Sequence, residues 1–457
     1  MMTKVTRRTV LALLSVLSFA VPSLAEDIDT FYVDGFKYIV ETDSTVAISD
    51  VGPDAPIPMS EDSTLTIPSV VEFEGRTYNV DRIYWEAFAL RQKIKHLVIG
   101  EGVKFIDQYA FYMCMGLTSV HLPSTYTGWI DRGEFLIGCC NLNRITIDER
   151  NYTYDSRDEC NAIILTEDST LVFGCLGTRI PATVTTIGPG AFRQCLKLES
   201  ITVPEGVRII EPCAFRNCAN LKEVSLPNSL EGIGYSAFSD CMSLETITIP
   251  QNVSQIRGND FYGKMLDPYN LFGGCHNLKE VRVDKRNRTF DSRSNCNALI
   301  DTSRDMIVAA CGNTVIPDGI KGIGAYAFTD ISIPDIRIPK SVQTIEPDAF
   351  WRCTFCSSVS VDAGNKAYNS KDNCNAIIET ATGKLIHGCS TTRIPNNVRE
   401  IGDGAFYGVR LPPLLIIPEG VETIGEHAFT RDCGLEYVKM PSTLKLIKND
   451  AFGCCDG

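Results

Sequence analysis

The dipeptide Ala-Phe returns every 23 residues in the middle of this chain, at positions 191, 214 and 237. Its Phe can be followed through twelve copies, most of them 22 to 24 residues apart, with one gap of 34 residues and three of 56 or 57. The copies are Phe88, Phe111, Phe135, Phe192, Phe215, Phe238, Phe272, Phe328, Phe350, Phe406, Phe429 and Phe452. A unit of this length cannot bury its own apolar face, whereas stacked units bury a continuous core. The repeat therefore predicts a solenoid in place of the two or three globular domains that 457 residues would otherwise suggest.

Each unit combines a strand pattern, a bend and a compact turn. The strand pattern Leu-x-x-Val-x-Leu-Pro alternates inward apolar residues with outward ones, and Pro ends it because Pro has no N–H to donate to a ladder. A Val-x-x-Ile-Gly segment follows, in which Gly permits a tight bend, and then the Ala-Phe-x-x-Cys turn. We therefore expect a β-rich solenoid of short strands and short helical turns.

Three repeats are longer than the rest, at about 148–181, 284–317 and 362–395. Each carries Cys-Asn followed by a second Cys 15 residues after the first, and the apolar runs between the two Cys predict a β-hairpin that replaces the Ala-Phe turn. In an antiparallel hairpin the residue numbers of directly opposed residues have a constant sum. If the hairpin closes between Ile164 and Leu171, this sum is 335, and Cys160 and Cys175 give the same sum. The same test holds in the other copies, with Ile300 opposite Ile307 and Ile378 opposite Leu385.

Directly opposed strand residues lie about 4.5 to 5.5 Å apart, so the two Cys of each copy are predicted to lie close together. They would form either a disulfide or a pair of buried thiols. The pairs are Cys160 with Cys175, Cys296 with Cys311 and Cys374 with Cys389.

Residues 1–25 have the pattern of a signal peptide. Lys4, Arg7 and Arg8 precede an apolar run over residues 10–20, and Ser-Leu-Ala at 23–25 offers small residues for cleavage. We expect export to the cell surface or the medium, although Arg7 and Arg8 also leave a twin-arginine signal open.

Residues 26–82 carry two aromatic-rich hairpin patterns, around Gly35 and Gly75, and are expected to form an N-terminal β-hairpin cap. Such a cap shields the edge strand and apolar face of the solenoid, which would occupy 83–457. The last ten residues stop where another strand would begin, so the C-terminal edge is expected to be uncapped, paired or truncated.

The net charge is −13, and removal of the three positive side chains in residues 1–25 would leave −13 − 3 = −16. Nucleic acid and anionic membrane surfaces are therefore poor partners. After residue 25 no apolar run approaches the roughly 18 residues that a membrane-spanning helix needs.

The repeat unit, the motif C-N-A-I-I and the opening FYVDGFKYIV together resemble the BspA-like leucine-rich repeat proteins of bacterial surfaces. The resemblance covers essentially the whole chain after residue 25. It implies a leucine-rich repeat solenoid, secreted or displayed on the cell surface, in a family associated with adhesion to host matrix proteins or other cells. The chain departs from the family pattern at Phe135 and Phe429, where the Cys comes one residue late, and at Phe88, Phe328 and Phe406, where it is absent.

The chain has 19 Cys, an odd number that leaves at least one outside intramolecular pairing. Nine of them follow the repeat Phe by three or four positions, as expected for a buried ladder of compact apolar thiols, with disulfides as the alternative. They are Cys114, Cys139, Cys195, Cys218, Cys241, Cys275, Cys353, Cys433 and Cys455.

No pattern points to catalysis, a metal or a cofactor. Cys353 and Cys356 form a CxxC, but each falls on a position that the repeat already explains, so redox or zinc chemistry is disfavoured. The five His are scattered over separate repeats. We therefore expect a non-enzymatic protein that holds no cofactor.

Strand alternation predicts which side chains project from the sheet. They are mostly Ser and Thr with scattered charges, which favours recognition of a protein by many small polar contacts, although a merely solvated sheet would look the same. The candidate binding face comprises Ser119, His121, Arg144, Thr146, Ser200, Thr202, Glu223, Ser225, Thr246, Thr248, Glu280, Arg282, Ser358, Ser360, Tyr437 and Lys439.

The leading hypothesis is an exported binding protein that adheres to host or matrix proteins or to other cells. The alternative is a structural or inhibitory scaffold that stacks on a partner, or on a second copy, through its C-terminal edge.

Overall fold

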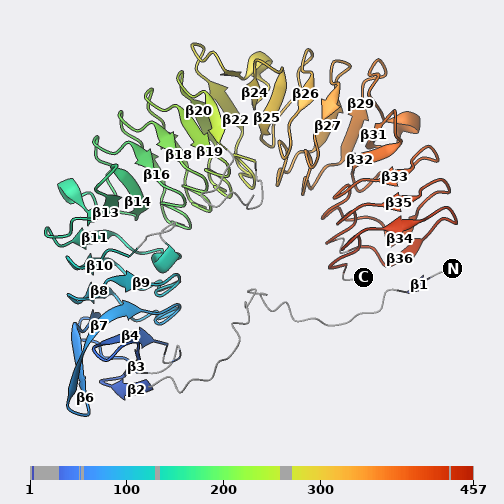
Figure 1. The fold of residues 1–457 in the computed structure, drawn as a ribbon. Coiled ribbons are helices and arrows are strands. Elements are labelled where there is room, and N and C mark those ends of the chain that lie inside the picture. The colour runs from blue at the N-terminus through green and yellow to red at the C-terminus, as the bar shows by residue number, and fades with distance from the viewer. Residues whose placement is uncertain are drawn as a thin grey trace. The chain divides into compact units, whose positions relative to one another are not determined.

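The computed structural model describes residues 3–4, 30–50, 52, 56–128, 134–257, 270–431 and 434–455. Figure 1 shows their fold as a ribbon, and they divide into two compact units. The N-terminal unit comprises the described residues from 30 to 242 together with 255–257. The C-terminal unit comprises 243–254, the described residues from 270 onward, and residues 3–4. Apart from Thr3 and Lys4, the expected signal peptide lies outside the described residues.

The first strand of each repeat is the Leu-x-x-Val-x-Leu-Pro segment, and these strands pair in parallel from one repeat to the next. Most of their inward side chains are buried, as at Ile201, whereas the neighbouring Ser200 and Thr202 are exposed. We call the outward side of these strands the strand face.

In the N-terminal unit the strand face is formed by β5 (Thr64–Ile67), β8 (His96–Ile99), β10 (Ser119–Leu122), β11 (Arg144–Ile147), β16 (Ser200–Thr202) and β18 (Glu223–Ser225). In the C-terminal unit it is formed by β20 (Thr246–Ile249), β22 (Glu280–Val283), β27 (Asp335–Ile338), β29 (Ser358–Val361), β34 (Leu414–Ile416) and β36 (Tyr437–Lys439), with β1 (Thr3–Lys4) antiparallel to β36.

A second row of parallel strands follows the bend. The Pro that ends the first strand accepts a hydrogen bond from the N–H three residues later, as between Leu230 N and Pro227 O at 3.2 Å, and this contact turns the chain. The N-terminal unit contains β9 (Phe105–Ile106), β15 (Thr186–Ile187), β17 (Ile209–Ile210), β19 (Gly232–Gly234) and β21 (Gln255–Arg257). The C-terminal unit contains β26 (Gly322–Ile323), β28 (Thr344–Ile345), β33 (Glu400–Ile401), β35 (Thr423–Ile424) and β37 (Leu446–Ile447).

Each long repeat folds into a short strand, a 3-10 helix and a hairpin whose last arm joins the second row. In the N-terminal unit these are β12 (Tyr154–Asp155), η2 (Arg157–Glu159), β13 (Ala162–Leu165) and β14 (Thr170–Gly174). In the C-terminal unit they are β23 (Phe290–Asp291), η3 (Arg293–Asn295), β24 (Ala298–Asp301) and β25 (Met306–Ala310), then β30 (Tyr368–Asn369), η4 (Lys371–Asn373), β31 (Ala376–Glu379) and β32 (Lys384–Gly388).

Five N-terminal strands form a mixed sheet in the order β2-β3-β4-β7-β6, and β9 of the second row pairs with β7. β2 and β3 form one hairpin and β6 and β7 form the other, at the two places where hairpins are expected. The strands are β2 (Thr30–Val33), β3 (Phe36–Val40), β4 (Thr45–Ser49), β6 (Val70–Phe73) and β7 (Arg76–Ile83).

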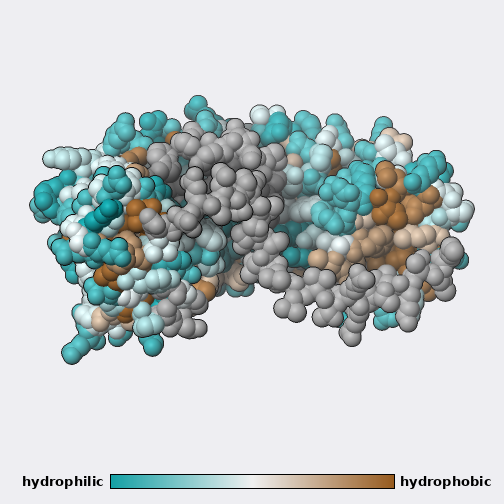
Figure 2. All heavy atoms as spheres, turned by 60° about the horizontal axis from the view of Figure 1, so that its bottom comes forward, coloured by the Kyte–Doolittle hydropathy of each residue, from teal (hydrophilic) through white to brown (hydrophobic). Residues whose placement is uncertain are grey.

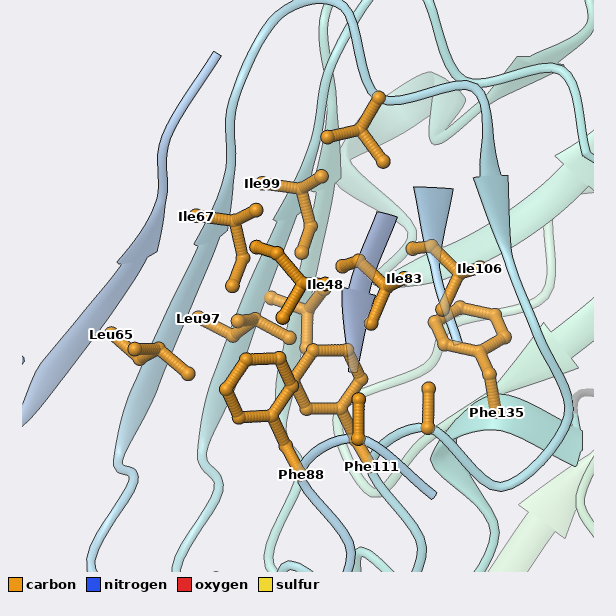
Figure 3. Close-up of a cluster of buried hydrophobic side chains, with 14 of the residues drawn as sticks. Ile48, Leu65, Ile67, Ile83, Phe88, Leu97, Ile99, Ile106, Phe111 and Phe135 are labelled. Atoms are coloured by element: carbon orange, nitrogen blue, oxygen red, sulfur yellow. The ribbon is translucent and has the colours of Figure 1, made fainter. Parts of the chain in front are cut away.

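The core of each unit contains stacked repeat Phe rings packed against buried Ile, Leu and Val side chains. Phe215 is fully buried, and its ring centroid lies 5.1 Å from that of Phe192 and 5.4 Å from that of Phe238, with nearly parallel ring planes. Figure 3 shows Phe88 beside Phe111 against the inward Leu and Ile side chains of the strands. Parallel rings at this spacing make the stack continuous between neighbouring repeats, as the sequence predicts.

The Ala-Phe turns are not helical, which corrects one expectation. In most repeats the residues two before and two after the Phe have left-handed φ, as at Cys213 (59°) and Asn217 (61°) around Phe215. Two left-handed residues four positions apart stop an α-helix at both ends. The helices among the described residues are three-residue 3-10 helices, η2 to η4 in the long repeats and η1 (Glu134–Leu136).

Candidate binding surface

The sixteen predicted outward residues all lie on the strand face, and all are exposed or half-buried. Parallel pairing places them opposite one another in rows. Ser119 lies opposite Arg144, Ser200 opposite Glu223, Thr246 opposite Glu280, and Thr248 opposite Arg282. The structure thus brings the candidates together within each small sheet.

Some of these side chains already bind one another. His121 Nδ1 lies 3.0 Å from Thr146 Oγ1, and Arg282 forms an ion pair with Glu280 at 2.6 Å. The ion pair is exposed, so it adds little to stability. These contacts hold part of the face in a fixed arrangement.

Sequence reasoning left out the outward residues of two strands of this face in the C-terminal unit. On β27, Asp335 and Arg337 project outward beside Ser358 and Ser360 of β29. On β34, Leu414 and Ile416 project outward instead of polar residues. The Pro that ends each strand was the signal that could have identified them. At β34 the continuous apolar run LLIIP obscures the alternation of period two.

Leu414, Ile416 and Tyr437 form an exposed apolar patch on the strand face. Their exposed fractions are 47%, 58% and 38%. Tyr437 lies opposite Leu414 in the parallel pair of β34 and β36, and Lys439 lies opposite Ile416. Figure 2 shows hydrophobic atoms gathered over the last strands of the C-terminal unit. We call these three residues the Leu414 patch.

The long-repeat hairpins close where the sequence predicts, but they contain a bulge. Ile164 pairs with Leu171, and the pairing then shifts so that Ile163 lies opposite Phe173. The partner numbers sum to 336 beyond the shift, and the extra residue moves Cys160 and Cys175 out of direct opposition. The same shift follows Ile300 with Ile307 and Ile378 with Leu385.

The Asn after the first Cys explains why the motif is repeated. Asn161 has a left-handed φ of 53°, which Asn tolerates better than most residues. Its carbonyl accepts hydrogen bonds from Cys175 Sγ at 3.2 Å and from Thr178 Oγ1 at 2.7 Å. In the other two copies the carbonyls of Asn297 and Asn375 likewise accept a hydrogen bond from a Thr hydroxyl. The motif is therefore a scaffold element, and oxidation of its Cys pairs stays a prediction.

The ladder Cys are hydrogen-bond donors as well as apolar filling. Cys218 Sγ donates to Phe192 O at 3.1 Å, and Cys241 Sγ donates to Phe215 O at 3.2 Å. Spacing alone could not reveal this donor role. Burial raises the pKa of Cys114 to about 12, so the reactive thiolate is disfavoured there. Cys433 lies outside the described residues.

The CxxC pair has the same character. Cys353 and Cys356 are both buried, and burial raises the pKa of Cys356 to about 11. Cys356 Sγ donates to Ser358 O at 3.2 Å. Within the described ranges, no group of three or more His, Cys, Asp and Glu side chains is arranged to hold a metal ion.

Six copies of the BspA type leucine rich repeat region match residues 78–162, 177–299, 309–384 and 386–457. The chain belongs to the BspA type leucine-rich repeat family. Its repeats are those of a protein-interaction family, which supports a binding role in general terms. No curated protein matches the chain.

Solved leucine-rich repeat structures are similar to this BspA type chain along most of its length. A leucine-rich cell surface protein of Faecalibacterium prausnitzii A2-165 is 21% identical, with 94% of this chain and 99% of that chain covered and a TM-score of 0.46. A leucine-rich repeat protein of Bacteroides ovatus ATCC 8483 is 22% identical, with 93% and 92% covered and a TM-score of 0.35. The pneumococcal vaccine antigen PcpA is 14% identical, with 94% and 80% covered and a TM-score of 0.34.

Among the residues that the structure describes, no helix of this BspA type protein is long and apolar enough to span a membrane.

Proposed function

We propose that this BspA type protein is exported, has no enzymatic activity, and binds protein ligands through its strand face. The observation that carries this proposal is the Leu414 patch, which exposes three large apolar side chains at positions where the other predicted face residues are polar. Protein interfaces commonly combine an apolar centre with a polar rim. The patch supplies such a centre, and Lys439 and Glu436 beside it are exposed and charged.

The rigidity of the sheet favours the same function. Leu415 and Ile417, which alternate with the patch residues, are buried in the core of the C-terminal unit. A partner that binds the patch therefore meets side chains held on an ordered backbone, so little conformational entropy is lost on binding.

Export and capping complete the proposal. The pattern of residues 1–25 supports cleavage of a signal peptide, and the family resemblance supports display at the cell surface or secretion. Residues 26–82 would cap the first repeat. Support comes from β7, which is continuous with the second strand row through its parallel pairing with β9, and from the ring of Phe31 stacked on Phe73 at 4.2 Å.

The proposed partners are host matrix proteins or proteins on other cells. The experiment applies the mature chain to immobilised extracellular-matrix proteins and to whole cells, and measures equilibrium binding. Leu414→Ser, Ile416→Thr and Tyr437→Ser together should weaken the binding at least about tenfold, because apolar residues at an interface centre carry most of the energy.

The matched control combines Glu223→Ala, Thr246→Ala and Glu280→Ala, which remove polar groups of the same face. This control should weaken binding by a smaller factor, and neither combination should change thermal stability greatly, because both alter outward residues. Full binding by the patch variant would disprove the proposed surface, and absence of binding to any matrix protein or cell would disprove adhesion.

A further inference from the structure

A second group of side chains gathers on the Ala-Phe turns of the C-terminal unit, away from the strand segments. Tyr407 directly follows Phe406, and two Gly flank this pair at the left-handed positions of the turn, Gly404 (φ 61°) and Gly408 (φ 66°). A Cβ on Gly404 would lie 2.6 Å from the ring of Trp351. Gly at this position therefore lets Trp351, from the turn after Phe350, lie against the backbone beside Tyr407.

Three rings meet at this place. The ring centroids of Trp351 and Tyr407 are 5.3 Å apart, and the His427 ring lies 5.6 Å from Trp351 at an angle of 81°. All three side chains are half-buried, so part of each remains open to solvent. We call Trp351, Tyr407, His427 and the two Arg described next the Tyr407 cluster.

Two guanidinium groups lie near the Tyr407 ring, one from the repeat turn before Tyr407 in the chain and one from the turn after it. Arg352 comes from the preceding Ala-Phe turn and Arg431 from the following one, with guanidinium carbons 5.8 and 6.0 Å from the Tyr407 ring centroid. Arg352 Nε is fixed by Asp330 Oδ1 at 2.9 Å, which orients the guanidinium group. His427 lies 3.9 Å from Glu426, so the cluster contains acidic as well as basic neighbours.

The geometry points to a binding site for an acidic glycan, a sugar chain that carries carboxylate or sulfate groups. Aromatic faces are electron-rich and attract the C–H groups of a sugar ring. The planar fork of Arg matches the two oxygens of a carboxylate or sulfate. A ligand that has both a ring of C–H groups and an anionic group uses both halves of the cluster.

The N-terminal unit offers a natural comparison. Tyr112 follows Phe111 as Tyr407 follows Phe406, and its ring lies 5.5 Å from Tyr109, which lies 6.4 Å from Trp85. These rings repeat the aromatic half of the arrangement, whereas ring contacts with two Arg are found at Tyr407. Tyr112→Ala is therefore a matched control for Tyr407→Ala.

The test measures binding of the mature full-length chain to size-defined heparin fragments, hyaluronan and neutral dextran by calorimetry at two salt concentrations. We expect binding to heparin, which carries sulfate, to hyaluronan, which carries only carboxylate, or to both. Binding should weaken at the higher salt, and dextran should not bind. Tyr407→Ala, and Arg352→Gln with Arg431→Gln, should each lower the affinity at least tenfold, whereas Tyr112→Ala and the Leu414-patch variant should leave it unchanged.

Arg431→Gln alone protects the test against misfolding, because Arg431 is exposed and its replacement should lower affinity without changing thermal stability. The inference is overturned if no acidic glycan binds, if dextran binds equally well, or if Tyr407→Ala has no effect while the Arg variants do. The last result would mean that the Arg side chains bind any anion, a phosphopeptide included.

Discussion

The two units differ in where they place polar and apolar side chains. At one hairpin position, opposite Ile163, the N-terminal unit buries Phe173, whereas the third long repeat of the C-terminal unit buries His387 opposite Ile377. On the strand face the apolar side chains belong to the other unit. The N-terminal unit presents polar residues such as Ser200 and Thr202, whereas the C-terminal unit exposes Leu414 and Ile416.

The buried His387 has a cost that the fold does not require. His387 stacks on Phe350 at 5.1 Å as an aromatic ring should, but neither of its ring nitrogens has a hydrogen-bond partner among the described residues. Phe173 fills the same position without that cost, 6.4 Å from Phe135. The core position therefore requires only a ring of suitable shape, while the outward residues are free to be selected for binding.

The largest effect should separate two adjacent residues of β34. Leu415→Ala should lower the free energy of unfolding by about 2 to 5 kcal/mol because it leaves a cavity in the core. Leu414→Ala should change it by less than about 0.5 kcal/mol, since Leu414 is exposed. Urea unfolding of both variants checks this, and similar losses would contradict the assignment of the patch to the surface.

The C-terminal unit should also be sensitive to acid through His387. Burial lowers the pKa of His387 to about 4 from its ordinary value of 6.5, so the folded state favours the neutral ring. Stability from this group is complete above pH 6.5 and is lost as the pH falls towards 4, by roughly 3 kcal/mol in all. The advantage of His387→Phe over the natural chain, measured by urea unfolding, should grow over this range, and a constant difference would be the contrary result.

At neutral pH, exchanging the side chains of His387 and Phe173 tests the same difference in stability between the two units. His387→Phe should stabilise the C-terminal unit by about 1 to 3 kcal/mol, because it removes two buried nitrogens that lack partners. Phe173→His should destabilise the N-terminal unit by a similar amount. Hydrogen exchange of β32 and β14 reports each effect locally, and stabilisation by both changes would break the comparison.

The smallest effect concerns a contact that both units share. Cys218→Ala and Cys455→Ala each remove a thiol that donates to the carbonyl of the preceding repeat Phe. The loss should be about 1 to 2 kcal/mol for the buried Cys218 and smaller for the half-buried Cys455. Thermal unfolding measures both, and no loss at Cys218 would mean that the thiol acts only as apolar volume.

Much of the fold was predictable because it depends on periodicity. The repeat Phe, the strand-ending Pro and the hairpin closure at Ile164 and Leu171 all lie where the sequence places them. The bulge after Ile164 was not predictable, since a partner-number sum assumes an uninterrupted ladder. The non-helical turns were missed because left-handed φ at residues such as Cys213 has no strong mark in the sequence.

The candidate site was predictable only in part. Alternation identified the polar outward residues, but at β34 the outward Leu414 and Ile416 look like core residues in the sequence. The Tyr407 cluster was missed for a different reason. Its members come from turns 56 and 23 residues apart, and only the stacking of those turns around the third long repeat brings Trp351 to Tyr407.

Hydroxyl-radical footprinting of the mature chain, alone and saturated with a matrix protein that it binds, tests whether the Leu414 patch is the binding surface. We predict that oxidation of Leu414, Ile416 and Tyr437 falls severalfold on binding, while Tyr235 and Met242, which are 40% and 45% exposed in the N-terminal unit, keep their reactivity. Unchanged oxidation of the Leu414 patch with protection elsewhere would contradict the strand face of the C-terminal unit as the binding surface.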